Sequence, residues 1–314
     1  MRYFPAMRAS PMPAMHQSFL PPGNEQAFVW KYSQSIGGRR PRHFHAEPEL
    51  NLIVRGSATF GVGQKVVTVS SGELIAFPTA QDHVLLDSSP DLYLYAIGLN
   101  SSYSAEVLGS EPSQPCHVRL AETELRSVIY SAADIVERSD IAQRGAELWQ
   151  RVHWLARRQG PRSAHATHVL TRRTLQLLRM GSDLPLSRLA QSVRAQPAEV
   201  SRHFHRDMGM TLVRYRMRLR LLHFIDLVDS RHVELMAAAN RAGFGSYSQC
   251  HRTFQAELNC SPREFFMAGL RDDMQSAYDD VQSAHTGGRS SAAHDAADAA
   301  DAADAADAAV SAES

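Results

Sequence analysis

The chain has 314 residues, 44% of them hydrophobic and 21% charged, and no apolar run approaches the roughly 18 residues of a transmembrane helix, which excludes such a helix. Its formal net charge is zero, yet residues 171–271 hold 16 Arg and 8 acidic residues, a net charge of +8, whereas residues 272–314 carry −9. A basic block of that density favours DNA or another polyanion as partner, although a solvated helical surface would have the same composition.

The first 24 residues contain several prolines and no continuous apolar segment. They are therefore predicted to form a flexible leader and not a secretory signal. The three cysteines, Cys116, Cys250 and Cys260, are widely spaced and form no CxxC pair. Such sparse cysteines fit a reducing compartment, so we predict a cytoplasmic protein without a disulfide framework.

Residues 25–115 are predicted to form a small β-barrel or β-sandwich. Apolar and polar residues alternate in short runs broken by Gly and Pro, as in ELNLIVRG, SATFGVG, KVVTVSSG, ELIAFP and DLYLYAIGL. A period of two with this punctuation is typical of short antiparallel strands.

A cluster of possible metal ligands lies in this region. The stretch RHFHAEPEL places His43, His45 and Glu49 close together, and His83 follows further along the chain. On a strand, His43 and His45 would point to the same side, as shared ligation requires. Three imidazoles and a carboxylate form a donor set that suits Fe, Mn, Ni, Zn or Cu.

The spacing of these residues resembles the two cupin motifs. The first runs Gly37, His43, His45, Glu49, Gly56, and the second runs Gly72, Pro78, His83, with Ala80 and Asp87 where Gly and Asn are usual. In metal-dependent cupins the matching residues converge on one ion. The resemblance implies either a divalent transition metal at His43, His45, Glu49 and His83, or a pocket in which the same residues bind an organic effector.

Residues 116–164 are predicted to form a helical linker and dimerisation region, because apolar residues recur there at three- and four-residue spacing. The same apolar stripe could instead pack on the barrel of its own chain, and the pattern does not separate the two alternatives. The candidates for the dimer seam are Leu125, Val128, Ile129, Ile135, Leu148, Val152 and Leu155.

Two helix-turn-helix patterns follow. In LSRLAQSVRAQPAEVSRHFHR (186–206), Pro197 suits the first position of the second helix. In VELMAAANRAGFGSYSQCHRTFQAE (233–257), Gly243 makes the turn and Ser246 is a favourable N-cap. The intervening GMTLVRYRMRLRLLHFIDLV predicts one long helix, which could place two recognition helices in successive segments of the major groove.

The segment GFGSYSQCHRTFQAELNCSPREFF at 243–266 resembles the signature of the AraC/XylS transcriptional regulators, and SRHFHRDMGMT with Tyr215, Arg218 and Arg220 matches in the first unit. The resemblance covers about a third of the chain. The sequence departs from the family pattern at Arg194, Gln196, Cys250, His251, Asn259, Cys260 and Phe266. These departures bear on base preference and local stability and leave the pattern intact.

The resemblance implies a seven-helix DNA-binding domain over 165–270, with recognition helices at 197–206 and 246–257. Arg can bind guanine and Gln can bind adenine through two hydrogen bonds each. The alternative is that Arg202 and Arg252 only bind phosphate or a carboxylate. The positions that match base-facing residues of the family are Ala198, Ser201, Arg202, Tyr247, Ser248, Gln249, His251 and Arg252.

These observations predict a two-domain α+β chain with a cupin-like β-barrel, a helical linker and an all-α domain that contains two helix-turn-helix units. Residues 271–314, which repeat DAA, are predicted to be a disordered acidic tail. The predicted function is ligand-responsive, sequence-specific regulation of transcription, as an activator and not as an enzyme. A small effector would bind at His43, His45, Glu49 and His83, and the further partners would be double-stranded DNA, RNA polymerase and a second copy of the chain.

Two other functions fit parts of the pattern. A metal-dependent cupin enzyme with a helical appendage would turn over a substrate and would not bind DNA specifically. A nonspecific architectural protein would bind every duplex equally, with a steep dependence on salt. The presence of two distinct helix-turn-helix units argues against both.

Overall fold

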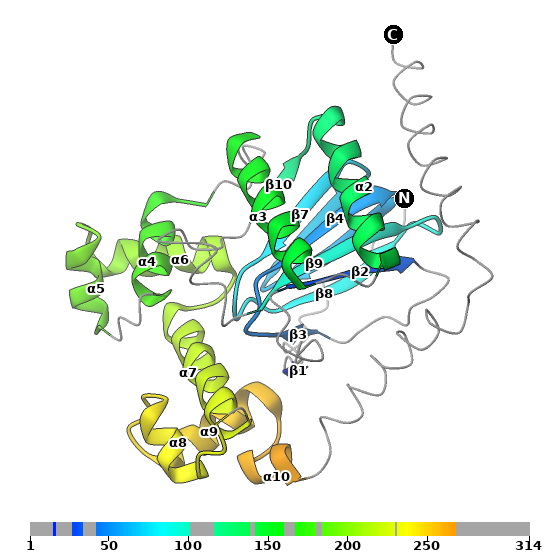
Figure 1. The fold of residues 1–314 in the computed structure, drawn as a ribbon. Coiled ribbons are helices and arrows are strands. Elements are labelled where there is room, and N and C mark those ends of the chain that lie inside the picture. Colours follow the sequence, from blue (N-terminus) through cyan, green and yellow to red (C-terminus); the bar gives the residue numbers. More distant parts are fainter. Residues whose placement is uncertain are drawn as a thin grey trace, which may run out of the picture.

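The computed structural model describes residues 15–16, 27–33, 42–100, 116–138, 142–159, 167–179, 184–229 and 231–267. Apart from 15–16, the predicted leader lies outside the described residues, as does the whole predicted acidic tail. The predicted α+β architecture is confirmed: a β-rich N-terminal part is followed by a helical C-terminal part (Figure 1). No helix in the described ranges is long and apolar enough to span a membrane.

The N-terminal part is a sandwich of two five-stranded sheets. Apart from the parallel pair β1–β3, neighbouring strands are antiparallel. A core that includes Ile53, Phe60 and Phe77 lies between the sheets. The first sheet has the order β1 (Met15–His16), β3 (His43–Phe44), β8 (His83–Ser88), β5 (Ser57–Val62), β6 (Lys65–Ser70). The second has the order β10 (Cys116–Arg119), β7 (Glu73–Phe77), β4 (Glu49–Arg55), β9 (Tyr93–Leu99), β2 (Ala27–Ser33).

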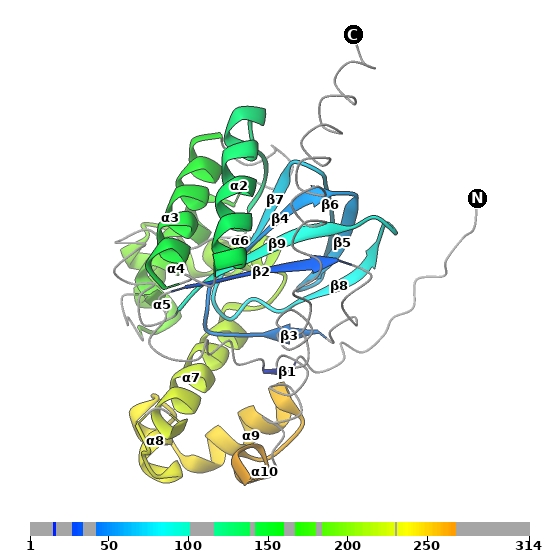
Figure 2. The same cartoon turned by 45° about the vertical axis from the view of Figure 1, so that its right-hand side comes forward.

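Two helices, α2 (Glu122–Arg138) and α3 (Ala142–Gln159), cover the outer face of the second sheet (Figures 1 and 2). Of the two alternatives for their apolar stripe, the structure has the second, in which the stripe packs on the sandwich of its own chain. Trp149 and most of the seam residues are buried in one cluster with residues of β2, β4, β7 and β9, while Leu125 and Ile129 pack against it. The reason is that six of the seven residues of β4 are buried, so the outer face of this sheet also needs an apolar cover.

The sandwich extends beyond residue 115, where the sequence predicted the helical region to begin. Residues Cys116–Arg119 form strand β10, which pairs with β7. His117 Nε2 lies 2.9 Å from Glu73 Oε2, and Arg119 Nη2 donates a hydrogen bond to Glu73 Oε1. A four-residue strand is too short for its alternation to be recognised in the sequence.

The C-terminal part consists of α4 (Val169–Arg179), α5 (Leu186–Ser192), α6 (Pro197–Met208), α7 (Leu212–Asp229), α8 (Leu235–Arg241), α9 (Tyr247–Leu258) and α10 (Pro262–Met267). The α5–α6 and α8–α9 pairs are the two helix-turn-helix units, and α7 joins them (Figure 2). Ser246 Oγ accepts the Gln249 N–H at the start of α9, as its N-cap prediction required. At the start of α6, Glu199 Oε2 instead accepts the N–H of Gln196.

Candidate functional site

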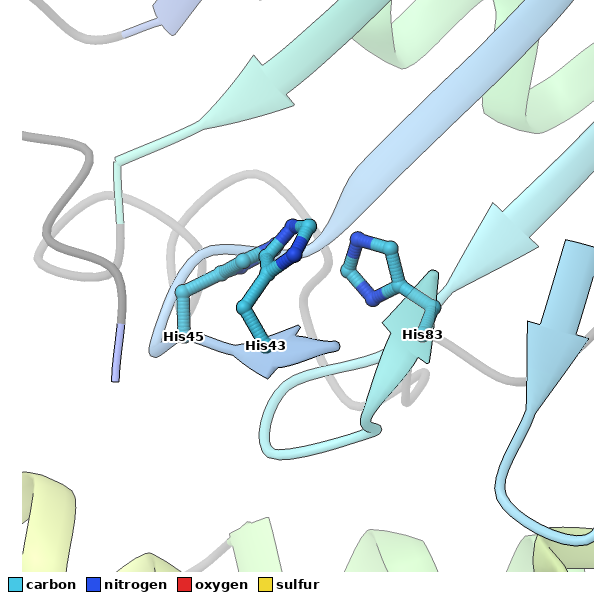
Figure 3. A group of neighbouring side chains, drawn as sticks. All are labelled: His43, His45 and His83. Carbon is cyan, nitrogen blue, oxygen red and sulfur yellow. The ribbon is translucent and has the colours of Figure 1, made fainter. Parts of the chain in front are cut away.

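Three of the predicted ligand residues lie together in the sandwich. His43 on β3 and His83 on β8 are direct partners across the two strands, and His45 follows β3. Figure 3 shows the three rings turned toward one another. One ring nitrogen from each lies within 4.8 Å of the others, and all three residues are buried.

Glu49 reaches the same point from the other sheet. Its Oε2 lies 3.0 Å from His45 Nε2 and 3.6 Å from His83 Nε2. Its Oε1 accepts a hydrogen bond of 2.7 Å from Asn51 Nδ2, which fixes the orientation of the carboxylate. The structure therefore brings Glu49 against His45 and His83 across the gap between the sheets, while the group whose ligand atoms all lie within 4.8 Å of one another consists of the three histidines.

The backbone determines which nitrogen of each ring faces the cluster. His45 Nδ1 lies 2.6 Å from the carbonyl oxygen of Glu47, and His83 Nδ1 lies 3.1 Å from that of Gln81. A carbonyl oxygen only accepts hydrogen bonds, so each Nδ1 carries the proton. In the neutral rings, Nε2 of both residues therefore directs a lone pair toward Glu49.

The cluster consists of hydrogen-bond acceptors that face one another. Within the described residues, Glu49 Oε2 and His83 Nε2 are buried atoms with no hydrogen-bond partner. Leaving such acceptors unpaired costs free energy, and a positive charge between them would remove that cost. Metal-binding histidines typically donate their second ring N–H to a backbone carbonyl, as His45 and His83 do here.

The electrostatics favour a neutral His45 ring and an ionised Glu49 carboxylate. Burial lowers the pKa of His45 and outweighs the opposing effect of Glu49. Burial raises the pKa of Glu49, whereas hydrogen bonds and positive charge from His45 and His83 lower it well below its usual range, as a cation placed between these residues would also do. These are the protonation states that a metal ion requires of its ligands.

Several residues that support the site were missed by the sequence analysis. The Phe77 ring stacks on His83 with a centroid distance of 4.0 Å. Burial raises the pKa of Glu47 to about 8, so this neighbouring carboxyl adds no charge at neutral pH. Asn51 lies two residues after Glu49 on a strand, so both side chains point to the same face. This spacing was the one signal in the sequence that Asn51 could donate a hydrogen bond to Glu49.

The predicted base-facing residues lie on α6 and α9. Val200 and Phe204 of α6, and Cys250 and Phe254 of α9, are buried and hold the opposite faces of the two helices in the core. Gln249 Oε1 accepts the N–H of Gly245 and so braces the turn. Ala198, Arg202, Ser248, His251 and Arg252 are exposed, whereas Ser201, Tyr247 and Gln249 are half-buried.

Comparison with known proteins identifies the kind of domain that the helical part contains. Residues 189–268 match a helix-turn-helix domain family. The transcriptional activator RhaS of Citrobacter koseri is 25% identical over 243 residues, which cover 71% of this chain and 86% of RhaS. The chain is similar to AraC/XylS-type transcription regulators. The resemblance predicted from the two helix-turn-helix units is thereby confirmed, and the regulator binds DNA through this domain.

Solved structures show looser likenesses. ToxT from Vibrio cholerae O395 aligns with a TM-score of 0.42 and 12% identity, covering 76% of this chain and 96% of that chain. The Mn(II)-containing oxalate decarboxylase of Bacillus subtilis aligns with a TM-score of 0.23 and 20% identity, covering 26% of this chain and 23% of that chain. At these scores neither likeness assigns a role to a residue of the regulator.

The helix-turn-helix match and RhaS favour a transcription regulator over an enzyme. The matched domain is of the helix-turn-helix type, and RhaS is named a transcriptional activator. The His–Glu cluster therefore has to be explained within a DNA-binding protein.

Proposed function

We propose that the regulator is a ligand-responsive activator whose sandwich binds a divalent transition-metal ion at His43, His45, Glu49 and His83. The ion is either the effector itself or the group that anchors a small organic effector. Binding at this site changes the affinity of the helix-turn-helix units for a specific operator. RhaS, a relative that is named an activator, supports the direction of the response.

One observation carries the metal assignment. Glu49 Oε2 and the Nε2 atoms of His45 and His83 are acceptors that meet in a buried space, at 3.0 and 3.6 Å. A proton is a poor source of the missing positive charge, since burial lowers the pKa of His45. An organic ligand alone would have to bring a hydrogen-bond donor to Glu49 Oε2 and His83 Nε2 at once. A metal ion satisfies three imidazoles and a carboxylate together.

For DNA recognition we propose that α6 and α9 enter successive segments of the major groove. Arg202 and Arg252 are exposed on these helices and are suited to two hydrogen bonds with guanine. Ala198, Ser201, Tyr247, Ser248, Gln249 and His251 would complete the surface that faces the bases. Gln249 contributes through its amide N–H group, because its carbonyl oxygen is engaged in the turn.

We further propose a cytoplasmic homodimer that contacts RNA polymerase. Because most of the predicted seam residues are buried within the chain, we propose that the dimer uses exposed residues of α2 and α3. Tyr130 is 75% exposed and Trp154 is 56% exposed, unusual values for large apolar side chains. Light scattering on the Trp154→Ala variant tests this surface, and an unchanged dimer mass would rule it out.

The metal assignment is tested by composition. The regulator is purified without chelator and without a histidine tag, and its transition metals are measured by elemental analysis. We expect about one ion per chain, and close to none in a His43→Ala/His45→Ala variant. The absence of metal from the wild-type protein would overturn the metal assignment and leave these residues as the wall of an organic-effector pocket.

A further inference from the structure

The helical part packs on the short segment 43–45, which carries two of the candidate ligands, His43 and His45. Phe44 lies between His43 and His45, and successive residues of a strand point to opposite faces. It is fully buried and belongs to one hydrophobic cluster with Phe204, Tyr215 and other residues of the helical part. The guanidinium of Arg218 on α7 lies over the Phe44 ring, with its Cζ 4.6 Å from the ring centroid. One short strand therefore faces the ligand site on one side and the DNA-binding part on the other.

The strand β8 has the same two-sided arrangement. His83 faces the ligand site, while Asp82, just before it, accepts a hydrogen bond of 2.7 Å from Arg218 Nη1. Arg218 Nε donates to Glu257 Oε2 on α9, also at 2.7 Å. Arg218 is 1% exposed, so this shared guanidinium is almost fully removed from water. A single side chain thus connects α7, the second recognition helix and the residue next to His83.

A second contact lies at the end of α6. Gly209 ends this helix with a φ of 66° and faces the β5–β6 hairpin tip, where Gly63 has a φ of 55°. A Cβ atom on Gly209 would lie 2.7 Å from the backbone nitrogen of Gln64, so the two backbones meet with no room for a side chain. Nearby, Lys65 Nζ donates to the carbonyl oxygen of Asp207 at 2.9 Å.

We propose that Arg218, seated on Phe44 and Asp82, couples the ligand site to the two recognition helices. Drawing His43, His45 and His83 onto a ligand shifts β3 and the start of β8, and this shift changes the contact between Phe44, Asp82 and Arg218. The population in which the helices are docked on the sandwich changes in response. The inference rests on the proposed function and adds the residues through which it acts.

Gly209→Asn is chosen to separate the two parts while every ligand residue stays in place. Asn is the residue most readily accepted after Gly at a left-handed helix end, and α9 already ends with Asn259 at a φ of 56°. The added Cβ meets backbone of the hairpin, which cannot move aside as a flexible side chain would. Asp82→Asn is the second variant, because it removes the charge that Arg218 contacts. Asp134→Asn is the control, since Asp134 pairs with Arg144 within the α2–α3 layer.

The first measurement is backbone amide hydrogen exchange in protein treated with chelator. We expect Gly209→Asn and Asp82→Asn to accelerate exchange in residues 43–49 and 80–83 by about five-fold or more, as an opening of the docked arrangement requires. Small-angle scattering should show a larger radius of gyration for both variants, and the control should match the wild type. Unchanged exchange at residues 43–49 in both variants would overturn the coupling.

The second measurement separates this inference from the metal assignment. Zn²⁺ affinity is determined by competition with a chelating dye. Linkage is reciprocal, so undocking should change the Zn²⁺ affinity by about five-fold or more with every ligand residue intact. Equal affinities in wild type and variants would overturn the coupling even if metal binds. If the wild-type protein binds no metal, the metal assignment fails, and the exchange measurement still decides the coupling.

Discussion

Glu49 is the single negative charge at the centre of the ligand site, and its replacement by Gln gives opposite effects on metal binding and on stability. The Gln amide N–H can donate to His45 Nε2, where Glu49 presents an acceptor at 3.0 Å. We expect the chelated Glu49→Gln protein to gain about 1 kcal/mol in free energy of unfolding. Its affinity for metal should fall about ten-fold or more. Chemical denaturation and metal competition measure the two quantities, and a loss of stability would contradict the acceptor cluster.

Asp207 predicts how the stability of the DNA-binding part depends on pH. Its carboxylate accepts hydrogen bonds from His168 N–H at 2.8 Å and Thr171 Oγ1 at 2.7 Å, which attach the start of α4 to α6. Burial opposes the charge, but these bonds and Arg206 hold the pKa of Asp207 below its usual value. A lowered carboxyl pKa stabilises the fold above about pH 3.9 and ceases to do so as the pH falls through the folded-state pKa.

Thermal unfolding at several pH values tests this linkage. Asp207→Asn should lower the melting temperature at pH 7, and its difference from the wild type should shrink steadily between about pH 5 and pH 3. A difference that does not depend on pH would show that the carboxylate charge is not the stabilising feature.

Arg252 is the residue on which sequence-specific recognition is expected to depend most. It is exposed on α9, whose other face is held in the core by Phe254. Arg252→Ala should weaken binding to a duplex selected in vitro by about 5- to 150-fold, the equivalent of 1–3 kcal/mol for a bidentate contact. Binding to a scrambled duplex should fall much less. Arg126→Ala, which removes an exposed Arg of α2, is the control. An equal loss of affinity for both duplexes would indicate that Arg252 contacts only phosphate.

Among the elements, the two helix-turn-helix units differ at their turns. Gly243 adopts a φ of 85° in the second unit, whereas Arg194 adopts a φ of 58° in the first. A left-handed conformation costs a residue with a Cβ atom about 1–2 kcal/mol. Because glycine also loses more entropy on folding, we expect Arg194→Gly to raise the free energy of unfolding by at most about 1 kcal/mol. Urea denaturation measures this change, and a loss of more than about 0.5 kcal/mol would contradict it.

The elements that the sequence predicted well have a clear period or a strong local signal. The five quoted strand runs became β4, β5, β6, β7 and β9, and the recognition helices expected at 197–206 and 246–257 became Pro197–Met208 and Tyr247–Leu258. The short strand β10 and the partner of the α2–α3 stripe were not predictable. Four residues carry no usable period, and an apolar stripe does not reveal what covers it.

At the scale of the whole molecule, the contact between the sandwich and the helical part could not be predicted from local sequence patterns. Phe44 and Ala80 would be assigned to the sandwich core by their apolar character, yet both are buried with the helical part. Arg218 matched a family position, but its partner Asp82 lies 136 positions away in the chain. The ligand cluster was predictable because its residues follow a known spacing, whereas no spacing rule links Asp82 to Arg218.

We propose that occupancy of the sandwich site controls sequence-specific binding of the whole chain to DNA. The most direct measurement is the affinity of the full chain for its selected duplex, by fluorescence anisotropy at fixed salt, in protein loaded with metal and in protein treated with chelator. We predict a difference of about five-fold or more in the wild type and a difference below about two-fold in Glu49→Gln. Equal affinities of the loaded and chelated wild-type protein would contradict the claim.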